Sequence, residues 1–408
     1  MKPLWDDVKT KLFFGYVLTN CHMKILYLHS TTIDSEKANL IQVLNMCNAF
    51  SKIGHEVTLI IKKSKTEHLN DKDYILNKFG IEVPYPLVFF EGGLSLFGRF
   101  REMGLLFSNI WSVTRNEIKK TKYDIVFIRS PIFLPLVKRF HIPVVYEIHN
   151  HLVHQDSRIL NYVWKRMLLK YCYVGVITKI VVISEALKKI WVSEGIAPDK
   201  ILACHDGFNT AHFEVELTKE EARALLEIKT EKKVVTYAGS LYADRGIGLI
   251  LKAAKQIPDA IFYVVGGPQD KVDYFKKSVI QNQVKNIVFT GRVSPREVRN
   301  YLFASDILLL IFTSDVPTIN YCSPLKLFEY MASGRTIVGH AFPTIKEVLT
   351  NSLNAVLVEP ENDDEFIEGL KRTIAIEDES LGKNARVAAF EHYRWETRAM
   401  NLVPFFKD

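Results

Sequence analysis

The sequence has few of the residues that mark disulfide-rich, zinc-binding or membrane-spanning proteins. Only 5 of its 408 residues are cysteine, and no two of them form a Cys-x-x-Cys pair. This scarcity argues against a disulfide framework and against a structural zinc site. No apolar run approaches the length of about 18 residues that a membrane-spanning helix needs. We therefore expect a cytoplasmic protein that is not integral to a membrane.

Two nucleotide-binding patterns are absent as well. The pattern G-x-x-x-x-G-K-[ST] does not occur, and the glycine-rich segment 264–268 does not fit G-x-G-x-x-G. P-loop and dinucleotide oxidoreductase interpretations thereby lose their main support. Disordered and collagen-like classes are excluded too, because 48% of the residues are hydrophobic and only 20 are glycine and 15 proline.

Length and charge limit the remaining classes. A chain of 408 residues exceeds a typical domain of about 150 residues more than twofold, so two domains are expected. The net charge of +7 is a mild excess. It suits anionic small molecules or an anionic membrane face better than dedicated nucleic-acid binding. Residues 1–22 read as an N-terminal extension without the features of a signal peptide.

Alternating strands and helices predict two doubly wound α/β domains. The first series has its strands at 24–29, 54–61, 123–129, 143–149, 179–184 and 201–204. The second has its strands at 234–239, 260–266, 287–291, 307–312, 336–339 and 355–358. Short, continuously apolar strands indicate parallel sheets covered on both faces. The polar stretch 209–233 places the domain boundary, giving domains 23–207 and 208–382 and a C-terminal segment 383–408.

Ligands of open α/β sheets bind beyond the carboxyl ends of the strands, so the residues there are site candidates. In the first domain these candidates are His29, Arg129 and His149. In the second domain they are Gly239, Ser240, Gly266, Gly267, Pro268, Gly291, Arg292 and His340. Small residues let a ligand approach the backbone, although such residues are also ordinary turn formers.

The sharpest local signal is the segment 323–334. Its composition predicts a buried helix with Pro324 at the first helical position and Gly334 as the stop. Lys326, Glu329 and Ser333 share the remaining polar stripe. A lysine in the first turn opposes the helix dipole, which a bound diphosphate would explain. A structural Lys–Glu pair is the alternative.

These residues carry a resemblance to a known family. In the second half the matching stretches are 237–246, 262–268, 286–293, 323–334 and 344–360. In the first half they are 23–29, 54–59, 144–149, 183–188 and 206–209. Together they resemble family 4 retaining glycosyltransferases of the GT-B architecture, also called glycosyl transferases group 1. The resemblance implies two Rossmann-like domains facing each other across a cleft, with segment 383–408 crossing back to the first domain.

The resemblance also implies roles for individual residues. Arg245 and Lys326 match the basic pair that holds the donor diphosphate, and Glu329 matches the carboxylate that holds the ribose. His149 matches a first-domain histidine near the transferring sugar. Donor contacts are further expected from Gly239, Ser240, Gly266, Arg292, Val293, Thr344 and Ile345. Arg292 and Val293 would lie in the loop that reads the base, and Thr344 and Ile345 in a loop near the donor sugar or phosphate.

Three departures from the family pattern stand out. Tyr321 occupies the position of the first of two glutamates, the one that usually contacts the donor sugar. Ser240 stands where many members have arginine. The segment 30–37 replaces the usual glycine-rich loop, so acceptor contacts and the identity of the sugar stay open.

The expected mechanism follows from charge. Breaking a sugar–diphosphate bond places negative charge on the leaving phosphate, which Arg245, Lys326 and helix N-termini would stabilise without a required metal or other cofactor. The only D-x-D triplet, at 71–73, is interpreted as a solvated loop. The family's front-face retention needs no enzymatic nucleophile. His149 is therefore interpreted as a sugar or phosphate contact, not as a general base.

The predicted function is transfer of a hexose from a nucleotide diphosphate sugar to a glycan or lipid-linked acceptor, in surface polysaccharide or lipopolysaccharide synthesis. Segments 94–111 and 163–170 mix aromatic, aliphatic and basic residues that could rest on the inner face of the cell membrane. Ordinary core-facing helices are the alternative for both. A catalytically silent relative serving as a partner subunit, and a GT-B epimerase or phosphorylase, are the rival functions.

Overall fold

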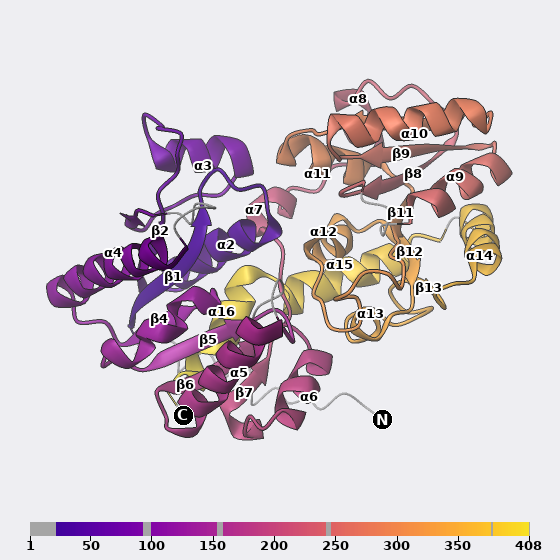
Figure 1. The fold of residues 1–408 in the computed structure, drawn as a ribbon. Helices are drawn as coiled ribbons and strands as arrows, with labels where there is room; N and C mark the ends of the chain where they lie inside the picture. The colour runs from indigo at the N-terminus through magenta and orange to yellow at the C-terminus, as the bar shows by residue number, and fades with distance from the viewer. Residues whose placement is uncertain (1–21, 93–98, 153–157, 242–245, 377, 408) are drawn as a thin grey trace.

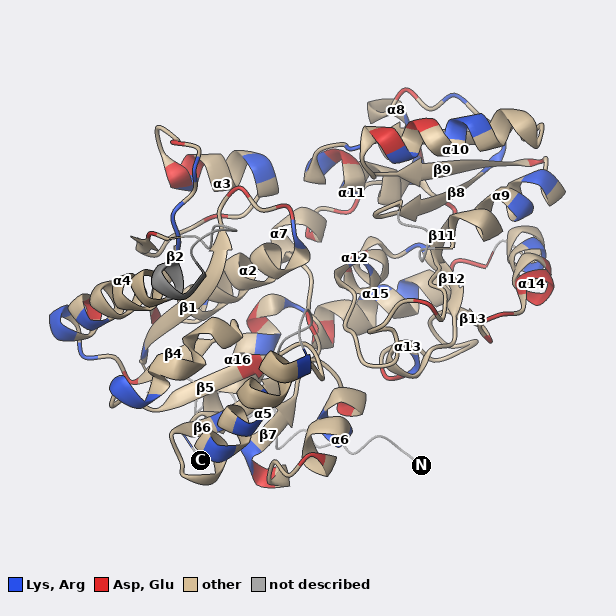
Figure 2. Ribbon diagram, in the orientation of Figure 1, with Lys and Arg blue, Asp and Glu red and all other residues tan. Residues whose placement is uncertain are grey.

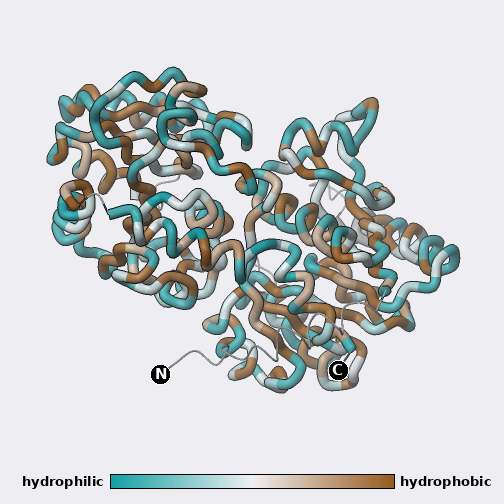
Figure 3. Tube along the Cα trace, turned by 180° about the vertical axis from the view of Figure 1, so that it is seen from behind, coloured by the Kyte–Doolittle hydropathy of each residue, from teal (hydrophilic) through white to brown (hydrophobic). Residues whose placement is uncertain are grey.

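The computed structural model describes residues 22–92, 99–152, 158–241, 246–376 and 378–407. These residues form two halves, each built around one parallel β-sheet (Figure 1). Hydrophobic segments run through the interior of both halves in Figure 3. The predicted pair of doubly wound α/β units is thereby confirmed.

The first sheet has seven strands in the order β3-β2-β1-β4-β5-β6-β7. Their bounds are β1 Lys24–Thr32, β2 Glu56–Lys62, β3 Leu87–Phe90, β4 Ile125–Ile128, β5 Val144–Ile148, β6 Ile177–Val182 and β7 Ile201–Ala203. The surrounding helices are α2 Ala38–Lys52, α3 Asp71–Phe79, α4 Arg99–Lys120, α5 Arg158–Tyr173 and α6 Glu185–Ser193, with 3-10 helices at Pro131–Arg139 and Pro198–Lys200. Every strand pair is parallel, and β4 and β5 are buried on both faces. The continuous apolar character of these strands follows from that burial.

The second sheet has six parallel strands in the order β10-β9-β8-β11-β12-β13. Their bounds are β8 Lys233–Ala238, β9 Ala260–Val265, β10 Ile287–Gly291, β11 Ile307–Leu310, β12 Thr336–His340 and β13 Val356–Val358. The helices are α7 Thr210–Phe213, α8 Lys219–Leu225, α9 Ile247–Gln256, α10 Gln269–Gln281, α11 Pro295–Ala304, α12 Leu325–Ser333, α13 Pro343–Lys346, α14 Asp363–Ile376, α15 Ser380–His392 and α16 Trp395–Phe405. The predicted boundary at residues 207 and 208 stays a prediction.

The last helix returns to the first half of the chain. While α15 packs against α12, α16 packs against α2 (Figure 1). Trp395, Ala399 and Leu402 are buried in the same apolar cluster as residues of β1 and α2. Phe208 and Arg394 pair as an isolated bridge, so the two chain segments that connect the halves lie side by side.

Side chains cap the N-terminal ends of several helices. The Ser184 hydroxyl accepts a hydrogen bond from the backbone N–H of Leu187 at the start of α6. Ser294 and Glu297 form a capping box at the start of α11. Each cap satisfies backbone N–H groups that have no partner inside the helix.

Several local predictions are wrong. The D-x-D triplet is not in a solvated loop, because Asp71 and Asp73 lie in the first turn of α3, which Asn70 caps. Strand β3, Leu87–Phe90, was not predicted, because an apolar run of four residues is too short to identify a strand by its pattern. Pro324 is the N-cap of α12 and not its first helical residue. Thr344 and Ile345 belong to the short helix α13 and not to a loop.

Candidate functional site

The carboxyl-end edges of the two sheets meet in the structure. The Tyr321 hydroxyl, in the segment after β11, donates to Asn150 Oδ1 just after β5 at 2.8 Å. The Ser184 hydroxyl after β6 donates to the Tyr321 carbonyl at 2.8 Å. The Glu347 carboxylate, directly after α13, accepts from the backbone N–H groups of Glu185 and Ala186 at the start of α6. Residues just past several strands of both sheets are therefore brought together where the two halves meet.

Glycines on the second-domain edge place backbone next to Lys326. A Cβ atom at Gly239 would lie 3.1 Å from Lys326 Nζ, and one at Gly266 would lie 2.6 Å from the Gly239 carbonyl oxygen. The Lys326 ammonium lies 4.1 Å from the centre of the Tyr237 ring. Both glycines have positive φ angles, of 153° and 106°. Only glycine tolerates these positive φ angles together with such close neighbours. The shape of the backbone next to Lys326 therefore depends on glycine at both positions.

The helix α12 presents Lys326 and Glu329 on successive turns. Burial raises the pKa of Glu329 to about 7, and the positive charge of Lys326 opposes this rise. Glu329 and Val293 line a cavity of about 210 Å³ together with Asn45 of α2 and Gly207 between the halves. The predicted ribose carboxylate and one predicted base-reading residue thus border the same interdomain space.

The other donor candidates have varied surroundings. The Ser240 carbonyl accepts a hydrogen bond from the Tyr237 hydroxyl at 3.0 Å. Arg292 Nη1 lies 2.6 Å from Glu36 Oε1 of the first half, in an exposed ion pair across the interdomain space. The Thr344 hydroxyl donates to the Ile319 carbonyl, while the side chain of Ile345 is fully buried. Both side chains pack inside the protein, next to the segment before α12. Thr344 and Ile345 could therefore contact a donor only through their backbone atoms. Arg245 lies outside the described residues.

The first-domain edge contains His149 at the end of β5. Its Nε2 atom lies 3.0 Å from Glu147 Oε1. Burial and the nearby Arg129 guanidinium lower the pKa of His149 to about 4, although the Glu147 carboxylate opposes this shift. The imidazole is therefore neutral at neutral pH and suited to hydrogen bonding, in agreement with its interpretation as a contact residue.

His29 and Arg129, the other first-domain candidates, lie close to His149. The His29 ring is 2% exposed, and its Nδ1 atom lies 3.0 Å from the Ser130 hydroxyl. Burial, followed by the charge of Arg129, lowers the pKa of His29 well below its usual range. The structure thus gathers the predicted residues of three neighbouring strands. In the second half, His340 has a structural role, because its buried ring bonds to the Phe312 carbonyl.

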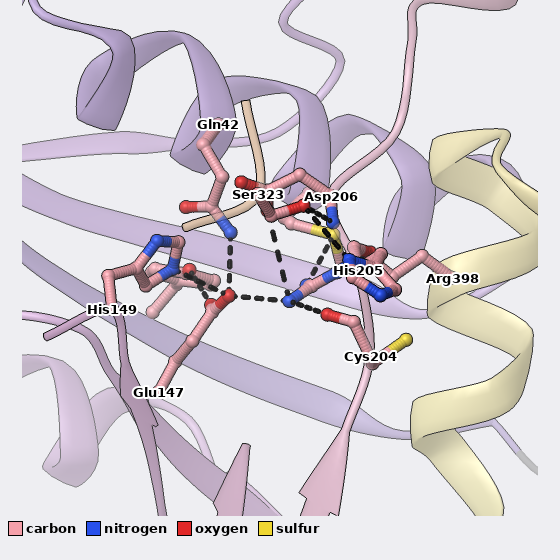
Figure 4. Close-up of polar contacts among 10 residues, drawn as sticks. Gln42, Glu147, His149, Cys204, His205, Asp206, Ser323 and Arg398 are labelled. Atoms are coloured by element: carbon pink, nitrogen blue, oxygen red, sulfur yellow. Dashed lines mark hydrogen bonds and ion pairs between the residues drawn. The ribbon is translucent and has the colours of Figure 1, made fainter. Parts of the chain in front are cut away.

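Sequence reasoning did not single out the network behind His149. Four side chains lie within hydrogen-bond distance of the fully buried Glu147 carboxylate, and Figure 4 labels three of them, Gln42, His149 and Arg398. The four are Tyr27 at 3.2 Å, Gln42 at 2.8 Å, His149 at 3.0 Å and Arg398 of α16 at 2.7 Å. A glutamate inside the otherwise apolar strand β5 was the available signal, because a buried carboxylate needs a partner.

A cation site at this network is not supported. The ligand atoms of Glu147, His149 and Asp206 lie within 4.8 Å of one another, a spacing that a metal ion could use. However, Arg398 Nη2 lies 2.7 Å from Glu147 and 4.0 Å from Asp206. The guanidinium already supplies the positive charge, and a metal ion beside it would be repelled.

Tyr321, the departure from the family pattern, joins the two halves. Its ring is 5% exposed and belongs to the apolar core of the first half. The hydroxyl donates to Asn150 and lies 2.8 Å from His151 Nδ1. Because both hydrogen-bonding directions of the hydroxyl are used, Tyr321 is an interdomain contact residue in this structure.

Comparisons with known proteins agree with this architecture. Residues 218–388 match the family description "Glycosyl transferases group 1", and residues 41–212 match "Glycosyltransferase Family 4". A lipopolysaccharide 1,2-N-acetylglucosaminetransferase of Salmonella typhimurium is 27% identical over 245 residues, which cover 56% of this chain and 62% of that protein. The alpha-monoglucosyldiacylglycerol synthase of Streptococcus pneumoniae is 22% identical over 272 residues, which cover 60% of this chain and 58% of that protein. The aligned parts thus span less than two thirds of either relative.

Solved structures show the same fold. The Anabaena protein HepE in complex with UDP and glucose has a TM-score of 0.73 at 15% identity, covering 95% of this chain and 100% of that one. A sucrose-phosphate synthase from Thermosynechococcus elongatus has a TM-score of 0.72 at 15% identity, covering 95% and 98%. Two family matches, one to each half, and two facing parallel sheets lead to one conclusion. The chain belongs to the family 4, group 1 glycosyltransferases and has the GT-B fold.

Proposed function

We propose that this protein transfers a hexose from a nucleoside diphosphate sugar to a glycan or lipid-linked acceptor, with retention of the anomeric configuration. The observation that carries the proposal is that Gly239 and Gly266 bring backbone next to Lys326, while Glu329 on the same helix lines the interdomain cavity. Backbone glycines and an ammonium suit a diphosphate, and a carboxylate suits the paired hydroxyls of a ribose.

Charge development explains how such an arrangement would accelerate transfer. The leaving diphosphate gains negative charge, and Lys326 lies in the first turn of α12, where backbone N–H groups also point outward. Preorganised positive groups of this kind stabilise the transition state more than the ground state, because the diphosphate carries more negative charge in the transition state. Arg245, which the family pattern pairs with Lys326, would add to this effect. No side chain of the described residues is assigned as a nucleophile.

The acceptor side of the proposal draws on relatives and on α5. Two of the relatives are a lipopolysaccharide 1,2-N-acetylglucosaminetransferase and an alpha-monoglucosyldiacylglycerol synthase. Helix α5 begins close to the end of β5 and exposes Ile159, Tyr162 and Val163 by 78%, 63% and 45%. Arg166 lies beside the Tyr162 ring. Apolar and basic side chains together suit a lipid-linked acceptor at an anionic membrane surface.

Part of the predicted membrane-surface segment 94–111 lies outside the residues that the structure describes. Residues 94–98 are not described, and α4 exposes Leu105 by 62%. Figure 2 shows Lys and Arg at the end of α4. No described helix is long and apolar enough to cross a membrane. Co-sedimentation with vesicles containing an anionic lipid at low salt tests the surface proposal, and loss of binding in the Ile159→Ser/Val163→Ser variant would support it.

The central experiment measures binding and transfer separately. A thermal-shift screen of nucleotide sugars identifies the donor, and transfer of labelled sugar to a lipid extract measures turnover. Lys326→Ala should lower kcat by roughly 100- to 1,000-fold, because one preorganised charge is lost. Glu329→Ala should mainly raise the KM for the donor. Lys371→Ala, which removes an exposed lysine paired with Glu368 on α14, is the matched control and should retain full activity.

The rival function is a catalytically silent GT-B relative that binds a sugar nucleotide as a partner subunit. Tyr321 favours this rival, because it replaces a glutamate of the family pattern. Binding of a nucleotide sugar by the wild-type protein without turnover of any donor would establish the rival and reject the enzyme. Product analysis separates an epimerase or phosphorylase, which would release a modified donor or a sugar phosphate.

A further inference from the structure

Arg398 is a buried cation whose guanidinium is directed entirely into the first half. Its side chain is 2% exposed, although it comes from the C-terminal helix α16. Nε donates to the His205 carbonyl at 2.9 Å, and Nη1 lies 3.1 Å from Met46 Sδ. Nη2 donates to Glu147 Oε1 at 2.7 Å and to the Cys204 carbonyl at 3.2 Å. These four hydrogen bonds hold the guanidinium in one position.

The guanidinium controls the charge of Glu147. Burial alone would raise the pKa of this carboxyl group, but Arg398 and the His149 hydrogen bond outweigh burial and hold the pKa far below its usual range. Glu147 is therefore ionised, and an ionised carboxylate only accepts hydrogen bonds. Tyr27 and Gln42 also donate to it, which is consistent with this state.

The ionised state of Glu147 determines the tautomer of His149. Because Glu147 Oε1 can only accept, the Nε2 atom of His149, 3.0 Å away, must carry the hydrogen. A neutral imidazole has one ring hydrogen, so Nδ1 is left as an acceptor. Figure 4 shows this second ring nitrogen turned away from Glu147.

We propose that Arg398 is a positioning residue which, through Glu147, keeps His149 in the Nε2–H form, so that Nδ1 accepts a hydrogen bond from a hydroxyl of the donor sugar. The inference rests on the proposed transfer reaction and makes one of its contacts specific. A nitrogen that only accepts cannot bind a phosphate oxygen, which also only accepts. His149 therefore contacts a hydroxyl of the sugar. The diphosphate is bound by the backbone at Gly239 and Gly266 and by Lys326.

Burial and two arginines keep His149 neutral, although the Glu147 carboxylate favours the charged form. Glu147 lies on the same strand, Arg129 follows β4, and Arg398 approaches from α16. Both arginines disfavour a charged imidazole, and burial does so more strongly. If Arg398 loses its charge, a buried Glu147 can hold a proton and donate it to Nε2. The imidazole hydrogen would then move to Nδ1, and the ring atom that faces the sugar would become a donor.

The test is nitrogen-15 NMR of the full chain labelled in histidine, with the His149 signal assigned by its loss in His149→Gln. In the wild type we expect a protonated Nε2 and an unprotonated Nδ1 between pH 6 and 8. Arg398→Met should shift the hydrogen toward Nδ1, and Arg398→Lys should restore the wild-type pattern. Arg386→Met is the control, because Arg386 is a partly buried arginine of α15 that contacts the Phe213 carbonyl.

Steady-state kinetics add a second readout once the donor is known. Arg398→Met should lower kcat/KM for the donor sugar by about tenfold, the value of one hydrogen bond, while Arg398→Lys recovers most of it. If Arg398→Met does not fold, the double variant Glu147→Leu/Arg398→Met removes the acceptor of the Nε2 hydrogen together with its cation, and it should also lower the hydrogen occupancy of Nε2.

The outcomes separate this inference from the proposed function. A wild-type His149 with its hydrogen on Nδ1, or an unchanged tautomer in folded Arg398→Met, would overturn the role of Arg398 even in an active enzyme. Absence of transfer with every nucleotide sugar would reject the function while leaving the tautomer measurement valid.

Discussion

The two edges that face each other in this protein are built in different ways. On the first-domain edge, buried side chains hold one another, with Glu147 bonded to His149 and to Arg398 of the last helix. On the second-domain edge, the shape comes from backbone, because Gly239 and Gly266 leave no room for a side chain. We therefore expect loss of the Arg398 cation on the first edge to cost more stability than loss of the Lys326 cation on the second edge, which should mainly cost activity.

The largest difference is expected between Arg398→Met and Lys326→Met. Removing Arg398 leaves the buried Glu147 carboxylate without its cation and should lower the free energy of unfolding by about 3–5 kcal/mol. Methionine at 326 keeps the apolar contact with the Tyr237 ring and should change stability by less than about 1 kcal/mol. Urea denaturation followed by circular dichroism measures both. Equal losses in the two variants would refute the contrast between the edges.

The free energy of unfolding should depend on pH through Asp206, which lies on the first-domain edge. Burial raises its pKa to about 7, against the opposing charge of Arg398. The folded state then binds more protons than the unfolded state, so this group's contribution to stability falls as pH rises, by up to about 1.4 kcal/mol per unit from pH 5 to 7. Asp206→Asn removes that contribution, and the variant should gain stability relative to wild type over this range.

The comparison of the two pH profiles isolates Asp206. Glu329, with a pKa also raised to about 7 by burial, contributes a slope of the same sign in both proteins. His149, whose pKa is lowered to about 4, contributes the opposite sign in both, since its stabilising effect is lost as pH falls from about 6.5 to 4. Parallel profiles of wild type and Asp206→Asn would show that Asp206 does not titrate in this range.

Gly266→Ala tests whether backbone shapes the second edge. The new Cβ would meet the Gly239 carbonyl oxygen at 2.6 Å on a backbone with a φ angle of 106°, so we expect a loss of about 1–3 kcal/mol and weaker donor binding. Gly248→Ala in α9 is the matched control, because no atom lies within 4 Å of its Cβ position. Alanine there should stabilise the helix by about 0.5–1 kcal/mol. Calorimetry of donor binding in both variants completes the test.

Tyr321→Phe should give the smallest effect and examines the contact between the edges. The substitution keeps the buried ring but removes the hydroxyl that donates to Asn150 Oδ1. Loss of the hydroxyl's hydrogen bonds to Asn150 and His151 should lower the free energy of unfolding by about 1–2 kcal/mol. Small-angle scattering should show more frequent separation of the halves. An unchanged scattering profile and unchanged stability would mean that other interdomain contacts suffice.

Much of the fold could be read from local pattern. Both sheets contain the predicted series of parallel strands, and Ser184 and Ser294 cap the helices α6 and α11. These features depend on side chains within a few positions of one another. By the same reasoning the D-x-D triplet was misread, because the Asn70 cap that makes it the first turn of α3 was overlooked.

The sequence by itself determined the alternation of strands and helices, the glycines at the strand ends and the spacing of Lys326 and Glu329, since each is a local property. Only the tertiary structure decided that Arg398 bonds to Glu147, 251 positions away, and that Tyr321 bonds to Asn150, 171 positions away. No local periodicity encodes such pairs. They form because packing α16 on the first sheet, and one sheet edge against the other, buries charges and hydroxyls that must then find partners.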